Sequence, residues 1–215
     1  MTRDADARTA AAARGWISGL AAAALAAVVA LSPGRAAAVA LAIDERWIEQ
    51  PVSARSLDDL VAALRATGTE EAHARTRVDY EQQATLVVEA DGRCVLDDVR
   101  LRVRIEVSVP TWSGDAPPAA VATAFERIAR GLRLHEAGHV AIAREEAAYR
   151  RAALAAAGDF ADCRAARRFL LRQQLEFERR VRWRNEAYDR ATQRGARQGA
   201  VIERRRPGRS ARRLG

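Results

Sequence analysis

Apolar residues recur at intervals of three and four between positions 117 and 157, a spacing that predicts one long amphipathic helix. A second amphipathic helix is predicted from about residue 160 to about residue 188, after the helix-breaking pair Gly158-Asp159. Because the break between them is short, we expect the two helices to pack antiparallel. The apolar row of the first helix consists of Phe125, Ile128, Leu132 and Ile142.

Before the long helix, apolar and polar residues alternate, and this period of two predicts a β-hairpin. Its strands are expected at residues 75–89 and 94–109, joined by the turn Ala90-Asp91-Gly92-Arg93. A first strand is expected at 47–52, followed by a short helix that Ser56 caps. The expected fold class is therefore α+β, with a small antiparallel sheet packed against two long antiparallel helices.

Residues 1–40 have the pattern of a secretory signal peptide. Residues 1–15 contain three arginines, residues 16–31 form an apolar core, and Ala38-Val39-Ala40 fits the small-residue cleavage pattern. Ala36-Ala37-Ala38 is an alternative cleavage site, and an uncleaved membrane anchor is the alternative to cleavage. We therefore expect a signal peptide at 1–40, a single domain at 41–202 and a disordered Arg-rich tail at 203–215, in a secreted or periplasmic protein.

The net charge of +8 is carried mostly by the two ends of the chain. Residues 1–40 hold four arginines and two aspartates, and residues 203–215 hold six arginines and one glutamate, which leaves +1 for residues 41–202. A nearly neutral body argues against a nucleic-acid-binding domain. We expect the basic tail to contact an anionic envelope surface.

The chain has two cysteines, Cys94 and Cys163. An exported protein folds where disulfides form, so we expect a bridge between them. It would close a loop of about 69 residues and contribute roughly 4 kcal/mol to the free energy of unfolding in the chain-entropy model. Two buried free thiols are the alternative.

The candidate chemistry lies at His135-Glu136-Ala137-Gly138-His139, within the predicted long helix. Histidines four residues apart share one helical face, so that two ring nitrogens can converge on a single Zn²⁺ ion. Glu136 is rotated by about 100° from His135, which suits it to act as the general base on water at the metal. The alternative is that both histidines are core residues satisfied by hydrogen bonds. The chain contains one further histidine, His73, in a charged stretch.

Several segments occur together with this motif. The hairpin ends in Pro110-Thr111-Trp112, Gly138 precedes the second histidine, residues 188–195 read Tyr-Asp-x-x-Thr-x-x-Gly, and residues 195–200 read Gly-Ala-Arg-Gln-Gly-Ala. In this combination residues 47–200 resemble a bacterial domain-of-unknown-function family described as predicted secreted zinc-dependent proteases. The resemblance implies zinc-hydrolase activity with the histidine pair as ligands.

The resemblance also implies a third ligand that this chain lacks. The family commonly has Thr-x-His-Gly where residues 192–195 read Thr-Gln-Arg-Gly, so that Arg194 occupies the position of a ligating histidine. Because catalytic zinc sites usually have three protein ligands, an acidic residue of the second helix is expected to replace it. Asp189 is the first choice, and Glu178 and Glu186 are the alternatives.

Two functions therefore remain open from the sequence. In the first, the protein is an exported zinc-dependent metallohydrolase, most simply a peptidase, which cleaves a peptide or another amide. His135, His139 and Asp189 hold the metal, and Glu136 is the catalytic base. In the second, the chain is a degenerate, metal-free family member that serves as an envelope binding or structural protein.

Overall fold

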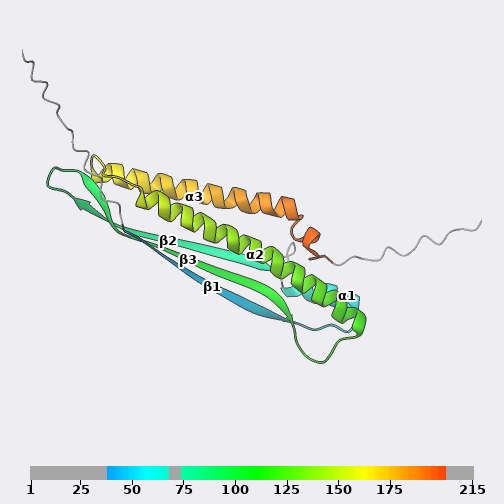
Figure 1. The fold of residues 1–215 in the computed structure, drawn as a ribbon. Coiled ribbons are helices and arrows are strands. Elements are labelled where there is room, and N and C mark those ends of the chain that lie inside the picture. The colour runs from blue at the N-terminus through cyan, green and yellow to red at the C-terminus, as the bar shows by residue number, and fades with distance from the viewer. Residues whose placement is uncertain (1–37, 68–73, 202–215) are drawn as a thin grey trace, which may run out of the picture. The chain divides into compact units, whose positions relative to one another are not determined.

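The computed structural model describes residues 38–67 and 74–201. Nearly all of the predicted signal peptide, His73 and the Arg-rich tail lie outside these residues. The elements, shown in Figure 1, are β1 (Val39–Val52), α1 (Leu57–Thr67), β2 (Arg75–Val88), β3 (Cys94–Trp112), α2 (Ala119–Ala155), α3 (Cys163–Thr192) and the short 3-10 helix η1 (Ala196–Gln198).

The sheet has the strand order β1-β3-β2 and is mixed rather than antiparallel. The predicted hairpin is present, with β2 antiparallel to β3, but β1 pairs in parallel with the other edge of β3. The prediction of a purely antiparallel sheet was therefore wrong. In the sequence β1 and β3 are separated by α1 and β2, and local alternation does not reveal pairing between strands so far apart.

The strand β1 is also longer than the predicted 47–52. Its first residue, Val39, pairs with Val99, and the Val99 N–H donates to the carbonyl of Ala38 at 3.3 Å. Cleavage after Ala40 would remove the first two residues of the strand, whereas cleavage after Ala38 would leave β1 whole. Cleavage after either residue would remove the Ala38 carbonyl that accepts from Val99.

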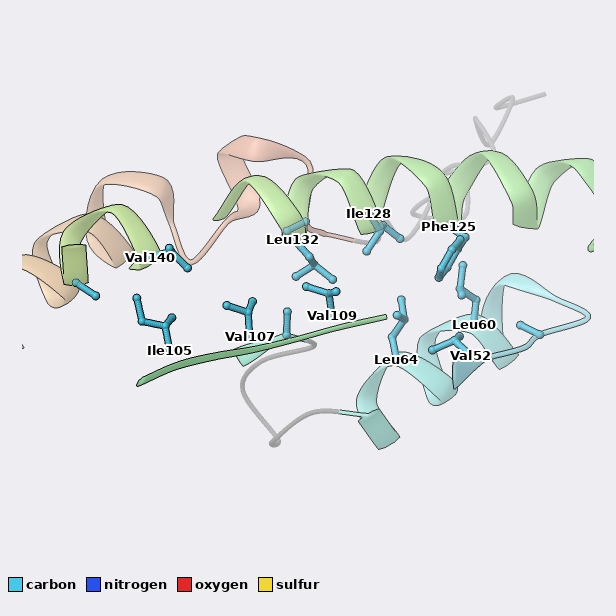
Figure 2. Packing of buried hydrophobic residues seen from close by; sticks show 14 of the residues in the cluster. Val52, Leu60, Leu64, Ile105, Val107, Val109, Phe125, Ile128, Leu132 and Val140 are labelled. Atoms are coloured by element: carbon cyan, nitrogen blue, oxygen red, sulfur yellow. The ribbon is translucent and has the colours of Figure 1, made fainter. Parts of the chain in front are cut away.

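The core lies between the sheet and α2, because the period of two in β3 and the helical period in α2 bury facing stripes. Figure 2 shows Ile128 and Leu132 of α2 directed towards Val107 and Val109 of β3. Leu60 of α1 closes one end of this cluster and is completely buried. The outward face of β3 carries the alternating charged residues and is exposed.

Helices α2 and α3 run antiparallel, as contacts between His139 and Asn185 and between Glu146 and Arg180 show. Glu146 is 1 % exposed and accepts hydrogen bonds from the guanidinium groups of Arg180 and Arg184. Burial by itself raises the pKa of this carboxyl, but the two guanidinium groups outweigh burial and hold the pKa below its ordinary value. This ion-pair cluster fixes the position of α3 along α2.

The predicted start of α3 at about residue 160 was three residues early. Phe160 forms a backbone bridge to Cys94, and Asp162 caps the helix by accepting from the Ala165 N–H at 2.6 Å. The helix then continues to Thr192, four residues beyond the predicted end.

The predicted disulfide is present and joins Cys94 at the start of β3 to Cys163 at the start of α3. Both residues belong to a second hydrophobic cluster that includes Leu154 and Phe160. The bridge therefore ties the hairpin to the start of α3.

Replacing both cysteines with alanine is expected to lower the free energy of unfolding by about 4 kcal/mol, because the bridge spans 69 residues. Alanine fits the completely buried position of Cys94 without adding a polar group. Urea denaturation followed by circular dichroism measures the change. If the urea midpoint of the variant equals that of wild type with its disulfide intact, the disulfide does not stabilise the fold.

Candidate metal centre

Two histidines of α2 and one aspartate of α3 meet at a single point. His135 Nε2 and His139 Nε2 are 3.3 Å apart, and Asp189 Oδ1 lies 3.2 Å from the first and 3.1 Å from the second. Among the described residues these three form a group whose ligand atoms lie within 4.8 Å of one another. A set of two imidazoles and one carboxylate is a recognised donor set for a catalytic zinc ion.

Asp189 takes part because of how the helices pair. Antiparallel packing places residues 185–189 beside residues 135–139, and α3 remains helical through this segment. The other two candidate acids lie elsewhere: Glu186 is exposed beside Arg190, and Glu178 accepts from Gln174.

The orientation of each imidazole is fixed by an amide side chain. Asn185 donates its Nδ2 to the carbonyl of Val181 at 3.0 Å, so its Oδ1 faces His139 Nδ1 at 2.7 Å. Gln198 donates its Nε2 to the Tyr188 hydroxyl, so its Oε1 faces His135 Nδ1 at 3.1 Å. An amide oxygen accepts only, and each Nδ1 must therefore carry the hydrogen.

When both imidazoles are neutral, both Nε2 atoms therefore present lone pairs to each other and to Asp189. Asp189 Oδ1 is buried and has no hydrogen-bond donor among the residues that the structure describes. Two lone pairs and a carboxylate oxygen at these distances repel one another unless a cation lies between them. The residues present therefore fit a divalent metal ion, with the outer-shell hydrogen bonds that metal-ligating histidines normally have.

Tyr188 and Gly138 form one wall of the centre. The Tyr188 ring stacks on His135 with a centroid separation of 5.2 Å and an interplanar angle of 12°. A Cβ atom at Gly138 would lie 2.1 Å from the Tyr188 hydroxyl, so glycine is required there for the tyrosine to fit. The glycine inside the motif thus admits a side chain of the neighbouring helix.

A second close approach holds the C-terminal segment in place. A Cβ atom at Gly131 would lie 2.5 Å from the backbone nitrogen of Ala200, so that only glycine lets residues 198–200 cross α2 here. This crossing brings η1, and with it Gln198, against His135. The end of the described chain therefore belongs to the site.

Glu136 lies beside the metal-ligand group without joining it. It is 4 % exposed, and its Oε2 accepts from the Thr76 hydroxyl of β2 at 2.6 Å. Glu136, both histidines and Asp189 line one cavity of about 610 Å³. The carboxylate that the sequence assigns to proton transfer thus faces the same space as the three ligand atoms.

Arg194 also lines this cavity, together with Arg75. It follows the end of α3 in the left-handed conformation, with φ of 51°, and its backbone N–H donates to the carbonyl of Asp189 at 2.8 Å. The side chain at the position where the resemblance implies a histidine is therefore basic and lies at the cavity, and Asp189 offers the third candidate ligand atom.

Sequence reasoning missed three residues of the centre: Thr76, Asn185 and Gln198. Asn185 and Gln198 are polar residues within segments already noted, one on the inner side of the second helix and one in the Gly-Ala-Arg-Gln-Gly-Ala ending. Thr76 lies at the start of β2 and has no local signal, because its role depends on the packing of β2 beside α2.

A family model described as "Bacterial protein of unknown function (DUF922)" matches residues 49–196. No curated protein and no solved structure matches the chain. The matched segment contains the hairpin, both histidines on α2 and Asp189 on α3. Since it covers more than half of the sequence, the chain belongs to the DUF922 family of bacterial proteins of unknown function.

Proposed function

We propose that this protein is a zinc-dependent hydrolase of amide bonds, most simply a peptidase, with its active site in the cavity between α2, α3 and β2. The observation that carries the proposal is the convergence of two imidazole lone pairs on a buried carboxylate oxygen that has no hydrogen-bond donor among the described residues. His135, His139 and Asp189 would hold the ion. The chemistry that such an ion supplies is that of a Lewis acid, which polarises a carbonyl and lowers the pKa of water.

Within this proposal each neighbouring residue has one task. Glu136 accepts the proton of the attacking water and delivers it to the leaving amine, and the Thr76 hydroxyl holds that carboxylate in position. Asn185 and Gln198 keep the imidazoles in the tautomer that directs Nε2 inward. The cavity of about 610 Å³ offers room for a short stretch of peptide beside these groups.

We further propose that the protein acts outside the cytoplasm. The disulfide supports this location, because such bridges persist in oxidising compartments, and the N-terminal signal pattern of the sequence agrees with it. Among the described residues no helix is both long and apolar enough to cross a membrane.

The test is zinc binding by protein purified without a histidine tag. We expect about one equivalent of zinc per chain, and a rise in the free energy of unfolding of about 2.7 kcal/mol when free zinc is 100 times its Kd. Peptide cleavage is expected to stop with a chelator and to return with zinc. Elemental analysis, thermal melts and a peptide-mixture assay provide the three readouts.

The outcomes separate the hydrolase from the metal-free alternative. A proton on one Nε2 atom would also satisfy Asp189, and a protein built this way would neither take up zinc nor gain stability from it. Zinc uptake without cleavage of any peptide or amide would support the proposed metal centre and contradict the proposed hydrolase activity.

A further inference from the structure

The outward face of α3 is strongly basic. Apart from Ala191, the exposed residues of the helix fall within a sector of roughly 160° at 100° per residue. This outer face of α3 consists of Arg164, Arg167, Arg168, Leu171, Arg172, Leu175, Glu178, Arg179, Arg182, Trp183, Glu186 and Arg190. Seven arginines and two glutamates give it a charge of +5.

This charge is concentrated on one element, because residues 41–202 as a whole carry only +1. The whole of α3 contains nine arginines and four acidic residues, which leaves −4 for the rest of that body. Residues 41–202 are therefore nearly neutral only because the positive charge of α3 is offset by the negative charge of the other elements. A surface of this kind attracts anions even though the domain has little net charge.

Most of these arginines are not paired with an acidic residue in the part of the chain that the structure describes. Arg190 pairs with Glu186, but the other six arginines of the outer face of α3 have no ion-pair partner among the described residues. The exposed arginines of β3 on the opposite side of the domain do have partners. Those pairs are Arg100 with Asp98, Arg102 with Asp44 and Arg104 with Glu81.

Three large apolar side chains stand among the unpaired arginines. Leu171 is 60 % exposed, Leu175 58 % and Trp183 64 %. The two leucines are one helical turn apart, so that their side chains form a single apolar ridge. Leucine and tryptophan beside arginine are the residues that surface-lying helices insert into the boundary between headgroups and acyl chains.

We propose that the outer face of α3 docks the domain on an anionic lipid bilayer, with α3 lying in the plane of the interface. The arginines contact lipid phosphates, and Leu171, Leu175 and Trp183 enter the acyl boundary. A second copy of this chain is disfavoured as the occupant, because two faces of +5 repel each other. A soluble polyanion would use the arginines but gain nothing from the apolar ridge.

The test is co-sedimentation of the full chain with phosphatidylcholine vesicles, with and without phosphatidylglycerol. The basic variant is Arg168→Gln/Arg172→Gln/Arg179→Gln. Its matched control is Arg100→Gln/Arg102→Gln/Arg104→Gln, which removes the same charge from the sheet. Both variants keep the N-terminal segment and the Arg-rich tail, so the contributions of those segments cancel in the comparison.

We expect wild type to bind only the anionic vesicles. Each arginine near such a surface contributes roughly a factor of five, so the basic variant should lose about 100-fold in partitioning, while the sheet control stays within about fivefold of wild type. An equal loss in both variants would overturn the proposal, since binding would then follow net charge alone. Circular dichroism checks that the variants, all altered at exposed positions, remain folded.

A third variant separates a bilayer from other partners. Leu171→Gln/Leu175→Gln/Trp183→Gln keeps the net charge, and we expect it to lose vesicle binding while retaining its elution position on a heparin column. The Trp183 emission should shift to shorter wavelength on vesicles, a shift that Trp183→Phe lacks. If this variant binds vesicles as well as wild type does, the face binds a soluble polyanion instead. If its oligomeric state differs from that of wild type, the face binds a second copy of the chain. Either result overturns the proposal.

Discussion

Glu136→Gln is expected to retain zinc and to lose about 10²- to 10⁴-fold in the rate of amide cleavage. Glutamine has the shape of glutamate but cannot accept the proton of the attacking water. The substitution leaves the proposed metal ligands in place, because the three candidate ligand atoms come from His135, His139 and Asp189. The fold should also be retained, since the Thr76 hydroxyl can donate to the new amide oxygen. Metal content and initial rates of peptide cleavage measure the two effects separately.

A matched control for this variant is Glu126→Gln, because Glu126 is an exposed acid of the same helix. We expect the control to have wild-type activity and metal content. If Glu136→Gln also cleaves peptide within a few-fold of the wild-type rate, Glu136 is not the base. Loss of zinc in Glu136→Gln would instead make Glu136 a ligand.

Asp189→Ala is expected to reduce zinc affinity by more than the roughly 10- to 100-fold that loss of an outer-shell partner of a metal site costs. The substitution removes the carboxylate oxygen that lies 3.1–3.2 Å from both Nε2 atoms and leaves two imidazoles as ligands. Competition with a chromophoric chelator measures the dissociation constant. Cleavage of peptide should fall in parallel.

Glu186→Ala provides the comparison for Asp189→Ala. Glu186 lies one turn away on the same helix and pairs with Arg190 at the surface, so its removal alters the local charge equally without touching the centre. Unchanged zinc affinity in this control, together with a large loss in Asp189→Ala, is expected. Equal and small effects in both variants would contradict Asp189 as the third ligand.

The elements of this fold could be predicted from the sequence, and their pairing could be predicted only in part. The alternation around Val103 and the helical row through Ile128 depend on neighbours two to four residues away, and both elements formed as expected. The disulfide between Cys94 and Cys163 could also be predicted, because each cysteine lies at the start of an element that the pattern indicates. The parallel partner of β3 was missed because parallel pairing requires a distant crossover, and because the first two residues of β1 were assigned to the signal peptide.

The candidate site, like the fold, could be predicted from the sequence only in part. The spacing of His135 and His139 on one helical face follows from 3.6 residues per turn, and the sequence alone therefore determined that two imidazoles lie together. Only the tertiary structure decided that Asp189 lies against them, that Asn185 and Gln198 direct their ring nitrogens inward, and that the arginines of α3 gather on one outer face. The physical reason is that these arrangements depend on the register between two packed helices. That register is determined by contacts between residues that are far apart in the sequence.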